Sequence, residues 1–242
     1  MVSARYGLAR DSELGDRGFR TAYWSRGYMV DRAAYVRRDF RYYHCFRPDW
    51  FVANPLSWRV ARWNDRDYWR YLTWIELATW CELAREPIDH DYGDNLVVSD
   101  GTVWYEGNSA GTPAQYTQET IALAARGAAA SPPPEAEWKA LGVFALVQGE
   151  EKTSNALFQM AVDKSGVIRG NYYDGFADKS AELFGQIDKK TQRAAWTIGK
   201  KTDRVFEAGA PNLARAETPA LVHTPGGAEQ VMLVRVEPPA GR

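Results

Sequence analysis

Apolar and polar residues alternate along much of the second half of the chain, most regularly between residues 156 and 174. Phe158, Met160 and Val162 fall on one face of an extended segment, which a Lys-Ser-Gly sequence then ends with a turn. The returning segment, residues 167–174, alternates in the same way. This pattern predicts a β-hairpin with one apolar face and one polar face.

Eight segments of this kind follow Trp138, and most are joined by turn sequences such as Asp188-Lys189-Lys190. No helical pattern interrupts them, so they favour an antiparallel meander that closes as a small barrel or a two-layer sandwich. The predicted strands are residues 141–148, 156–163, 167–174, 182–187, 192–198, 204–209, 218–223 and 230–236.

Helical periodicity appears twice in the first half of the chain. Residues 65–85 carry apolar side chains every three or four positions, and Pro87 would end this helix. Residues 112–127 begin with Thr112 as N-cap, followed by a proline, and Gly127 is expected just past the helix end.

A hairpin is predicted over residues 95–106, because Asp100-Gly101 suits the positive φ angles of a type I′ turn. The chain is therefore expected to be α+β, with a Trp-rich helical and hairpin N-terminal region and an eight-stranded antiparallel β-barrel or sandwich. The expected divisions are an Arg- and aromatic-rich irregular region (1–63), a helix–hairpin–helix region (64–127), an Ala/Pro linker (128–137) and a β-meander domain (138–237).

Charge and aromatic residues are unevenly distributed. Residues 1–72 hold fourteen Arg, no Lys and eight acidic residues, whereas the remainder carries a net charge of -7. Eighteen of the thirty-two aromatic residues lie in residues 1–75, without a sustained period of 2 or 3.6. We expect short helical turns and extended pieces there, ordered by packing against the rest of the protein.

Two cysteines, Cys45 and Cys81, leave two alternatives open: a disulfide in an exported protein, or two buried free thiols. His44 and His90 lie near them, but the four residues lack the spacing of a metal site, so no metal is predicted. No apolar run is long enough for a transmembrane helix, and the N-terminal residues lack the apolar stretch of a signal peptide.

The polar face of residues 167–174 is the candidate ligand-binding strip, formed by Arg169, Asn171 and Tyr173. Trp196 is added because an indole can stack on a sugar. The alternative for all four residues is a structural role, with the strip as one hairpin wall and Trp196 in the core.

Catalytic signals are weak. The three histidines fall in no known catalytic frame, and no glycine-rich nucleotide motif is present, so the sequence predicts no cofactor and no enzyme activity. The arginines of the N-terminal region are interleaved with aspartates, which favours packing of arginine on aromatic rings over nucleic-acid binding.

The strings YGDNLVVSDGTVWYEGNSAGTP, EWKALGVFALVQGEE, LFQMAVDKSGVIRGNYYD and DKKTQRAAWTIG carry a resemblance. Together they resemble an uncharacterised planctomycete-type bacterial family often labelled mu-protocadherin or cell-surface protein. The resemblance covers about residues 41–236. It implies an exported protein of the periplasm or cell surface with a structural or binding role, and it supplies no catalytic residues.

Three functional hypotheses follow. The first is a non-enzymatic protein with a structural or interaction role in the bacterial cell envelope, whose partners are envelope proteins or glycans. The second is a lipocalin-like barrel that holds one small apolar or amphipathic molecule. The third is a hydrolase of an envelope polymer.

Overall fold

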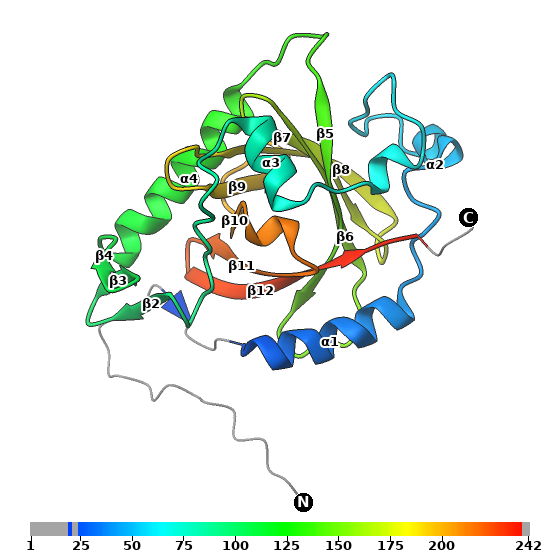
Figure 1. Cartoon of the computed structure of the whole chain (residues 1–242). Coiled ribbons are helices and arrows are strands. Elements are labelled where there is room, and N and C mark those ends of the chain that lie inside the picture. The colour runs from blue at the N-terminus through cyan, green and yellow to red at the C-terminus, as the bar shows by residue number, and fades with distance from the viewer. Residues whose placement is uncertain (1–18, 21–23, 239–242) are drawn as a thin grey trace, which may run out of the picture.

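The computed structural model describes residues 19–20 and 24–238, and it shows an eight-stranded antiparallel barrel wrapped by the preceding half of the chain (Figure 1). Strand β12 pairs with both β11 and β5, which closes the barrel. The barrel strands are β5 (Trp138–Gln148), β6 (Ala156–Asp163), β7 (Val167–Asp174), β8 (Lys179–Ile187), β9 (Arg193–Ile198), β10 (Val205–Gly209), β11 (Glu217–Thr224) and β12 (Gly227–Val236).

The predicted meander is therefore confirmed, and the closed barrel is the form it takes. Each predicted strand matches an observed strand to within a few residues, because the turn sequences fix where each strand ends. The first of them, β5, starts at Trp138, and a bulge between Ala140 and Gly142 bends it.

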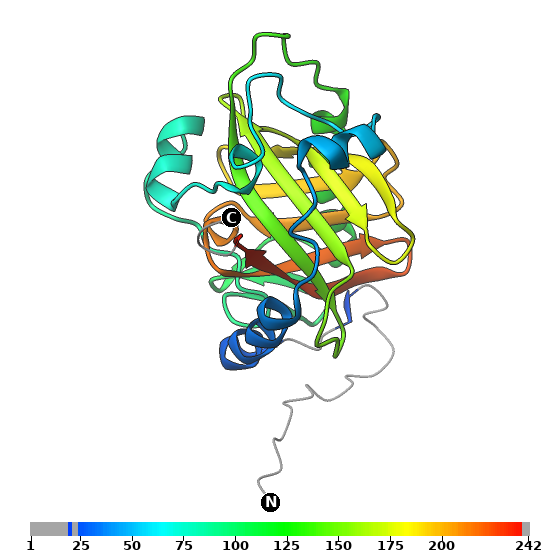
Figure 2. The ribbon, with the colours of Figure 1, turned by 90° about the vertical axis from the view of Figure 1, so that its right-hand side faces the viewer.

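The barrel interior is filled by side chains, which we call the lumen cluster. Its largest members are all buried, and Trp196 and Phe206 stack with ring centroids 5.9 Å apart. Helix α3 (Trp74–Cys81) contributes to the same cluster and lies over one end of the barrel (Figure 2). The bulkiest side chains of the lumen cluster are those of Phe144, Phe158, Met160, Ile168, Leu183, Trp196 and Phe206.

Residues 24–129 form a coat on the outside of the barrel. The coat consists of α1 (Arg26–Asp39), α2 (Pro48–Ala53), the 3-10 helix η1 (Asp67–Trp69), α3, strands β2 (Leu96–Ser99), β3 (Thr102–Tyr105) and β4 (Asn108–Ser109), and α4 (Pro113–Ala129). The two remaining elements are β1 (Phe19–Arg20), which pairs in parallel with β12, and the 3-10 helix η2 (Asn212–Ala214) before β11.

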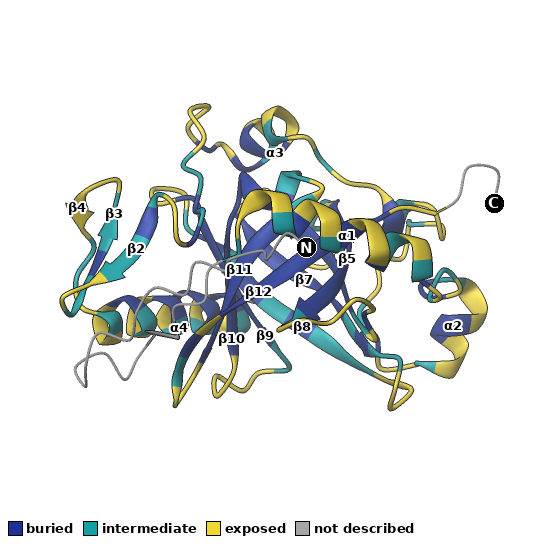
Figure 3. Cartoon of the chain, turned by 90° about the horizontal axis from the view of Figure 1, so that it is seen from below, coloured by how far each residue is buried: buried dark blue, intermediate teal, exposed yellow. Residues whose placement is uncertain are grey.

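Both faces of most of the barrel wall are buried as a result, and β8 is the barrel strand that stays partly exposed. Aromatic residues of the coat, including Phe46, Trp50 and Trp69, pack against outward-facing residues of β5, β6 and β12. Figure 3 shows most barrel strands as buried, whereas β8 is largely intermediate and the β2–β4 hairpin is partly exposed. The hairpin of residues 156–174 has the predicted apolar and polar faces, and the coat buries most of the polar face as well.

The helix predicted over residues 65–85 is shorter than expected. Thr73 and Glu76 form a reciprocal capping box, so α3 begins at Trp74, and it ends at Cys81 because Glu82 adopts a left-handed conformation with φ 54°. The preceding Tyr68 and Trp69 belong to the coat on the outer wall, whereas α3 packs on the lumen cluster. One straight helix could not contact both the outer wall and the lumen cluster at the end of the barrel.

The predicted turn and N-cap of the coat are confirmed. Asp100 and Gly101 have φ angles of 50° and 69°, as a type I′ turn requires. Thr112 caps α4 together with Gln115. Gly127, however, lies inside α4 and not past its end, because the helix continues to Ala129. A Cβ atom on Gly127 would lie 2.1 Å from the backbone of Gly185 on β8.

This contact predicts opposite effects for two helical glycines. Gly127→Ala would force α4 away from β8 and should destabilise the fold by about 1–3 kcal/mol. Gly27→Ala in α1, where an added Cβ has no neighbour within 4 Å, should stabilise it by about 0.5–1 kcal/mol through helix propensity. Urea unfolding measures both, and equal effects would refute the close approach of α4 to β8.

Candidate functional site

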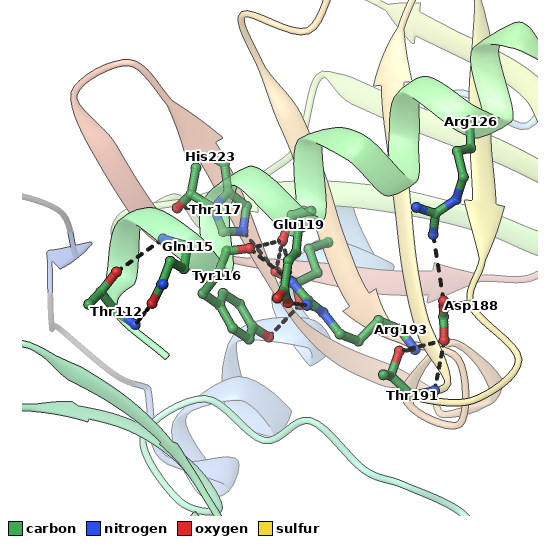
Figure 4. A network of polar contacts seen from close by, with 12 residues as sticks. Thr112, Gln115, Tyr116, Thr117, Glu119, Arg126, Asp188, Thr191, Arg193 and His223 are labelled. Atoms are coloured by element: carbon green, nitrogen blue, oxygen red, sulfur yellow. Dashed lines mark hydrogen bonds and ion pairs between the residues drawn. The ribbon is translucent and has the colours of Figure 1, made fainter. Parts of the chain in front are cut away.

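The most concentrated chemistry in the described chain is an ionic network buried between α4 and the outer face of β9–β11. Glu207 lies at its centre and is fully buried. It accepts hydrogen bonds from Arg193 Nε at 2.9 Å, from Tyr116 Oη at 2.6 Å and from Thr120 Oγ1 at 3.2 Å. His223 Nε2 lies 2.7 Å from the second carboxylate oxygen. In Figure 4 the contacts of Tyr116, Arg193 and His223 meet between helix and sheet.

Strand register brings these residues together. Glu207 pairs with Ala195, two residues from Arg193, and Val205 pairs with His223. Because alternate residues of a strand share a face, the three ionisable side chains all point out of the barrel. Tyr116 and Thr120 are four residues apart on α4, so they face the sheet one turn from each other.

The network stabilises the ionised forms of Glu207 and Arg193. Burial alone would raise the pKa of Glu207, but the Arg193 guanidinium and the hydrogen bonds from His223 and Tyr116 outweigh burial and lower that pKa. Burial opposes the charge of Arg193 as well, but Glu207 raises the pKa of Arg193 above its ordinary value. Burial and the neighbouring Glu207 raise the pKa of Tyr116. Glu207 and Arg193 therefore remain a buried ion pair at neutral pH.

A cleft of about 640 Å³ opens beside this network, between the β2–β4 hairpin and α4, and we call it the hairpin–helix cleft. Its lining combines apolar and polar side chains from the hairpin, the start of α4 and the β8–β9 turn. Those that bear on its chemistry are His90, Tyr105, Gln115, Tyr116, Glu119 and Arg193.

The imidazole of His90 provides a hydrogen-bond acceptor in the wall of this cleft. Its Nδ1 lies 3.0 Å from the carbonyl of Ile88, so Nδ1 carries the proton and Nε2 keeps its lone pair. Burial lowers the pKa of His90, which keeps the ring neutral. No donor to Nε2 is found in the described part of the chain. The ring stacks on Tyr105 at a centroid distance of 5.3 Å, so the pair forms a flat wall.

The predicted binding strip is buried under the coat. Arg169 donates to the carbonyls of Gly127 and Ala130 at the C-terminal end of α4, and Asn171 donates to the carbonyl of Trp58 at 2.8 Å. Tyr173 bonds Asp178 at 2.8 Å and contacts Trp50 and Tyr42 through ring edges.

The structure therefore places Arg169, Asn171 and Tyr173 together on the outer face of β7, as the alternation predicts, where each holds part of the coat. Trp196 lies inside the barrel, against Phe158 and Phe206, so it is separated from the other three by the barrel wall.

Cys45 and Cys81 are free thiols, and no disulfide joins them. Cys45 packs in the coat on the outer wall, and Cys81 packs in the lumen cluster. Burial raises the pKa of each thiol to about 12, so both are un-ionised at neutral pH.

Neither a metal-binding group nor a membrane-spanning helix is found among the described residues. Within residues 19–20 and 24–238, no group of three or more His, Cys, Asp and Glu side chains is arranged to hold a metal ion. The helices of the same residues are all too short or too polar to cross a bilayer.

A scan against protein-family models found no match. Searches of curated proteins and of solved structures found no match either.

Sequence reasoning missed the ionic network, although one signal was present. Glu207 is a single charge inside the strand-length apolar run VFEAG, and Arg193 stands at the start of the apolar segment AAW. An isolated charge in such a run indicates a buried charge with a partner. The partner could not be named, because Tyr116 and His223 come from distant segments.

The network predicts unequal effects for the two carboxylates that contact Arg193. Glu207→Gln leaves a buried guanidinium without its anion and should destabilise the fold by about 3–5 kcal/mol at pH 7. Glu119→Gln, which removes an exposed partner 3.3 Å from Arg193, should cost less than about 1 kcal/mol. Urea denaturation of both variants measures the difference.

The same pair gives a pH test. The folded pKa of Glu207 is lowered, so its contribution is complete above the ordinary glutamate pKa of about 4.3 and is lost as pH falls toward the folded value. The stability gap between wild type and Glu207→Gln should therefore shrink below about pH 4. A gap that is constant from pH 7 to pH 3 would contradict an ionised Glu207.

Proposed function

We propose that this protein is a non-enzymatic interaction protein of the bacterial cell envelope, in which the barrel is a scaffold and the partner binds the coat. The observation that supports this most is the filled lumen. Phe158, Trp196 and Phe206 occupy the barrel centre with no solvent exposure, and α3 packs on them from one end. The hairpin–helix cleft lies outside the barrel.

The state of the reactive groups supports a non-enzymatic role. Glu207 and Arg193 are bonded to each other and to α4, so the network joins helix to sheet. Arg193 directs its donors to Glu207, Glu119, Thr120 and the Tyr116 carbonyl. The two thiols are un-ionised and enclosed.

The envelope location rests on the family resemblance of residues 41–236. A disulfide would have added support for export, and the structure has none between Cys45 and Cys81.

Small-ligand binding is the second candidate function. An eight-stranded barrel can hold one small molecule in its interior, but side chains fill the lumen of this barrel and weigh against a ligand there. The hairpin–helix cleft offers a different binding site, because its volume suits a small ligand and the buried His90 acceptor lies in its wall. A hydrolase needs two carboxyl groups about 5–10 Å apart, whereas Glu119 is the one carboxylate among the residues that line this cleft.

A lipophilic fluorescent probe, N-phenyl-1-naphthylamine, tests where small molecules bind. Wild-type protein should give no saturable binding that a fatty acid displaces, because side chains fill the lumen. Saturable binding that Tyr105→Ala abolishes would place the ligand in the hairpin–helix cleft and favour the second candidate. Saturable binding that neither Tyr105→Ala nor Trp138→Ala, at a partly exposed indole outside the lumen, changes would place it in the lumen and contradict the scaffold proposal.

Cell fractionation tests the envelope location. The protein, expressed from its own gene in its native bacterium, should follow periplasmic or outer-membrane markers. A distribution that follows a cytosolic marker enzyme would refute this part of the proposal, whatever the probe experiment shows.

A further inference from the structure

A second hollow on the coat is lined by three tryptophans, and we call it the tryptophan cleft. Trp63 comes from the loop before η1, Trp80 from α3 and Trp138 from the start of β5. All three side chains are partly exposed, and the cleft between them has a volume of about 300 Å³. Large aromatic groups that are exposed together mark interaction sites, so the three indoles around this hollow indicate a binding surface.

Ring contacts and a hydrogen bond fix the orientation of the three indoles. The ring of Trp58 meets Trp138 at 5.1 Å and Trp63 at 6.1 Å, edge to face in both cases. The Trp80 indole N–H donates to the carbonyl of Val162. Asn171 anchors the Trp58 carbonyl, so the predicted strip on β7 supports this cleft without lining it. Ordering of the indoles before binding lowers the entropic cost of association.

Charged groups of both signs surround the indoles. Arg62, Glu135, Glu137 and Lys139 are exposed at the edge of the cleft. Lys164 pairs with Glu137 at 2.5 Å and lies 4.9 Å from the Trp80 ring centre. Exposed ion pairs and cation–π contacts of this kind contribute little stability, so a ligand can displace them.

The combination favours a sugar ring as ligand. A pyranose ring has an apolar C–H face that stacks on an indole, and its edge carries hydroxyl groups that donate to carboxylates and accept from ammonium and guanidinium groups. A polyanion would need a clear surplus of positive charge, and the two carboxylates at this edge oppose it. A proline-rich peptide needs indole N–H donors for its carbonyls, and one of the three, that of Trp80, is already bonded to the carbonyl of Val162.

We propose that the tryptophan cleft binds a polysaccharide chain, with one sugar ring stacked on an exposed indole face and its hydroxyl groups bonded to Arg62, Glu135 or Lys139. This inference rests on the proposed interaction role and names the class of ligand. The site is distinct from the hairpin–helix cleft, which lies beside α4 and shares no lining residue with it.

Binding of soluble oligosaccharides tests the site. Chitotetraose, cellotetraose and a proline decapeptide are titrated separately into the full chain, and affinity is followed by calorimetry and tryptophan fluorescence. Wild type should bind at least one oligosaccharide, and Trp63→Ala and Trp138→Ala should weaken that binding by about tenfold or more. Trp104→Ala, at a half-buried indole on β3 outside the cleft, should leave the affinity unchanged.

A milder variant guards against misfolding. Arg62 is exposed, so Arg62→Ala should retain the wild-type melting temperature and still weaken oligosaccharide binding several-fold. No binding of either oligosaccharide by wild type, or equal binding by wild type and the Trp63 and Trp138 variants, would overturn the proposal. Binding of the proline decapeptide alone would also overturn it, because it would identify a peptide groove.

The outcomes separate this inference from the envelope proposal. Oligosaccharide binding by a protein that fractionates with the cytosol would leave the cleft assignment intact and refute the envelope role. An envelope protein that binds neither oligosaccharide would keep its location and lose the assigned ligand.

Discussion

Burial of the barrel wall on both faces is the constraint on which the rest of this structure depends. The lumen is packed with aromatic and aliphatic side chains, and the coat covers much of the outside. Every polar side chain on a covered outer face has therefore lost water and needs a partner from the coat. Glu207 finds Tyr116 and Thr120 on α4, and Asn171 finds the Trp58 carbonyl.

The same constraint explains the buried arginines. Arg169 donates to carbonyls at the C-terminal end of α4, where the helix dipole favours a cation. Arg235 donates to the carbonyls of Leu141 and Leu213, and it lies over the rings of Phe144 and Tyr71. A guanidinium suits such positions because its planar fork bonds several carbonyls at once while its face packs on an aromatic ring.

Sequence alone was sufficient for the strands of the meander but left open whether they close as a barrel or a sandwich, and it was sufficient for only part of the coat. Strands such as β6 and β7 follow from alternation and from the turn at Gly166, which are local properties. Helix α1 was not predicted. It buries only three residues, Met29, Ala33 and Val36, and so few buried positions give no sustained helical pattern of apolar residues. The place of Gly127 inside α4 depends on Gly185, a residue of β8 that no local pattern connects to it.

The candidate sites were hidden for the same reason. Tyr116, Arg193, Glu207 and His223 come from four elements, and their meeting depends on how α4 docks across the sheet. The strip of Arg169, Asn171 and Tyr173 was located correctly on one face of β7, but the coat that buries it could not be deduced from alternation.

Both clefts lie at joints between the coat and the barrel, which links binding to stability. The hairpin–helix cleft is bounded by Tyr116 and Arg193, two members of the ionic network that fixes α4. The tryptophan cleft is bounded by Trp63 and Trp138, which pack on the ring of Trp58, and Asn171 of β7 bonds the Trp58 carbonyl. A ligand in either cleft would contact coat and barrel together, and would stabilise the folded chain by binding it in preference to the unfolded chain. The polar contacts that compensate for burial of the wall therefore also set the geometry of the binding surfaces.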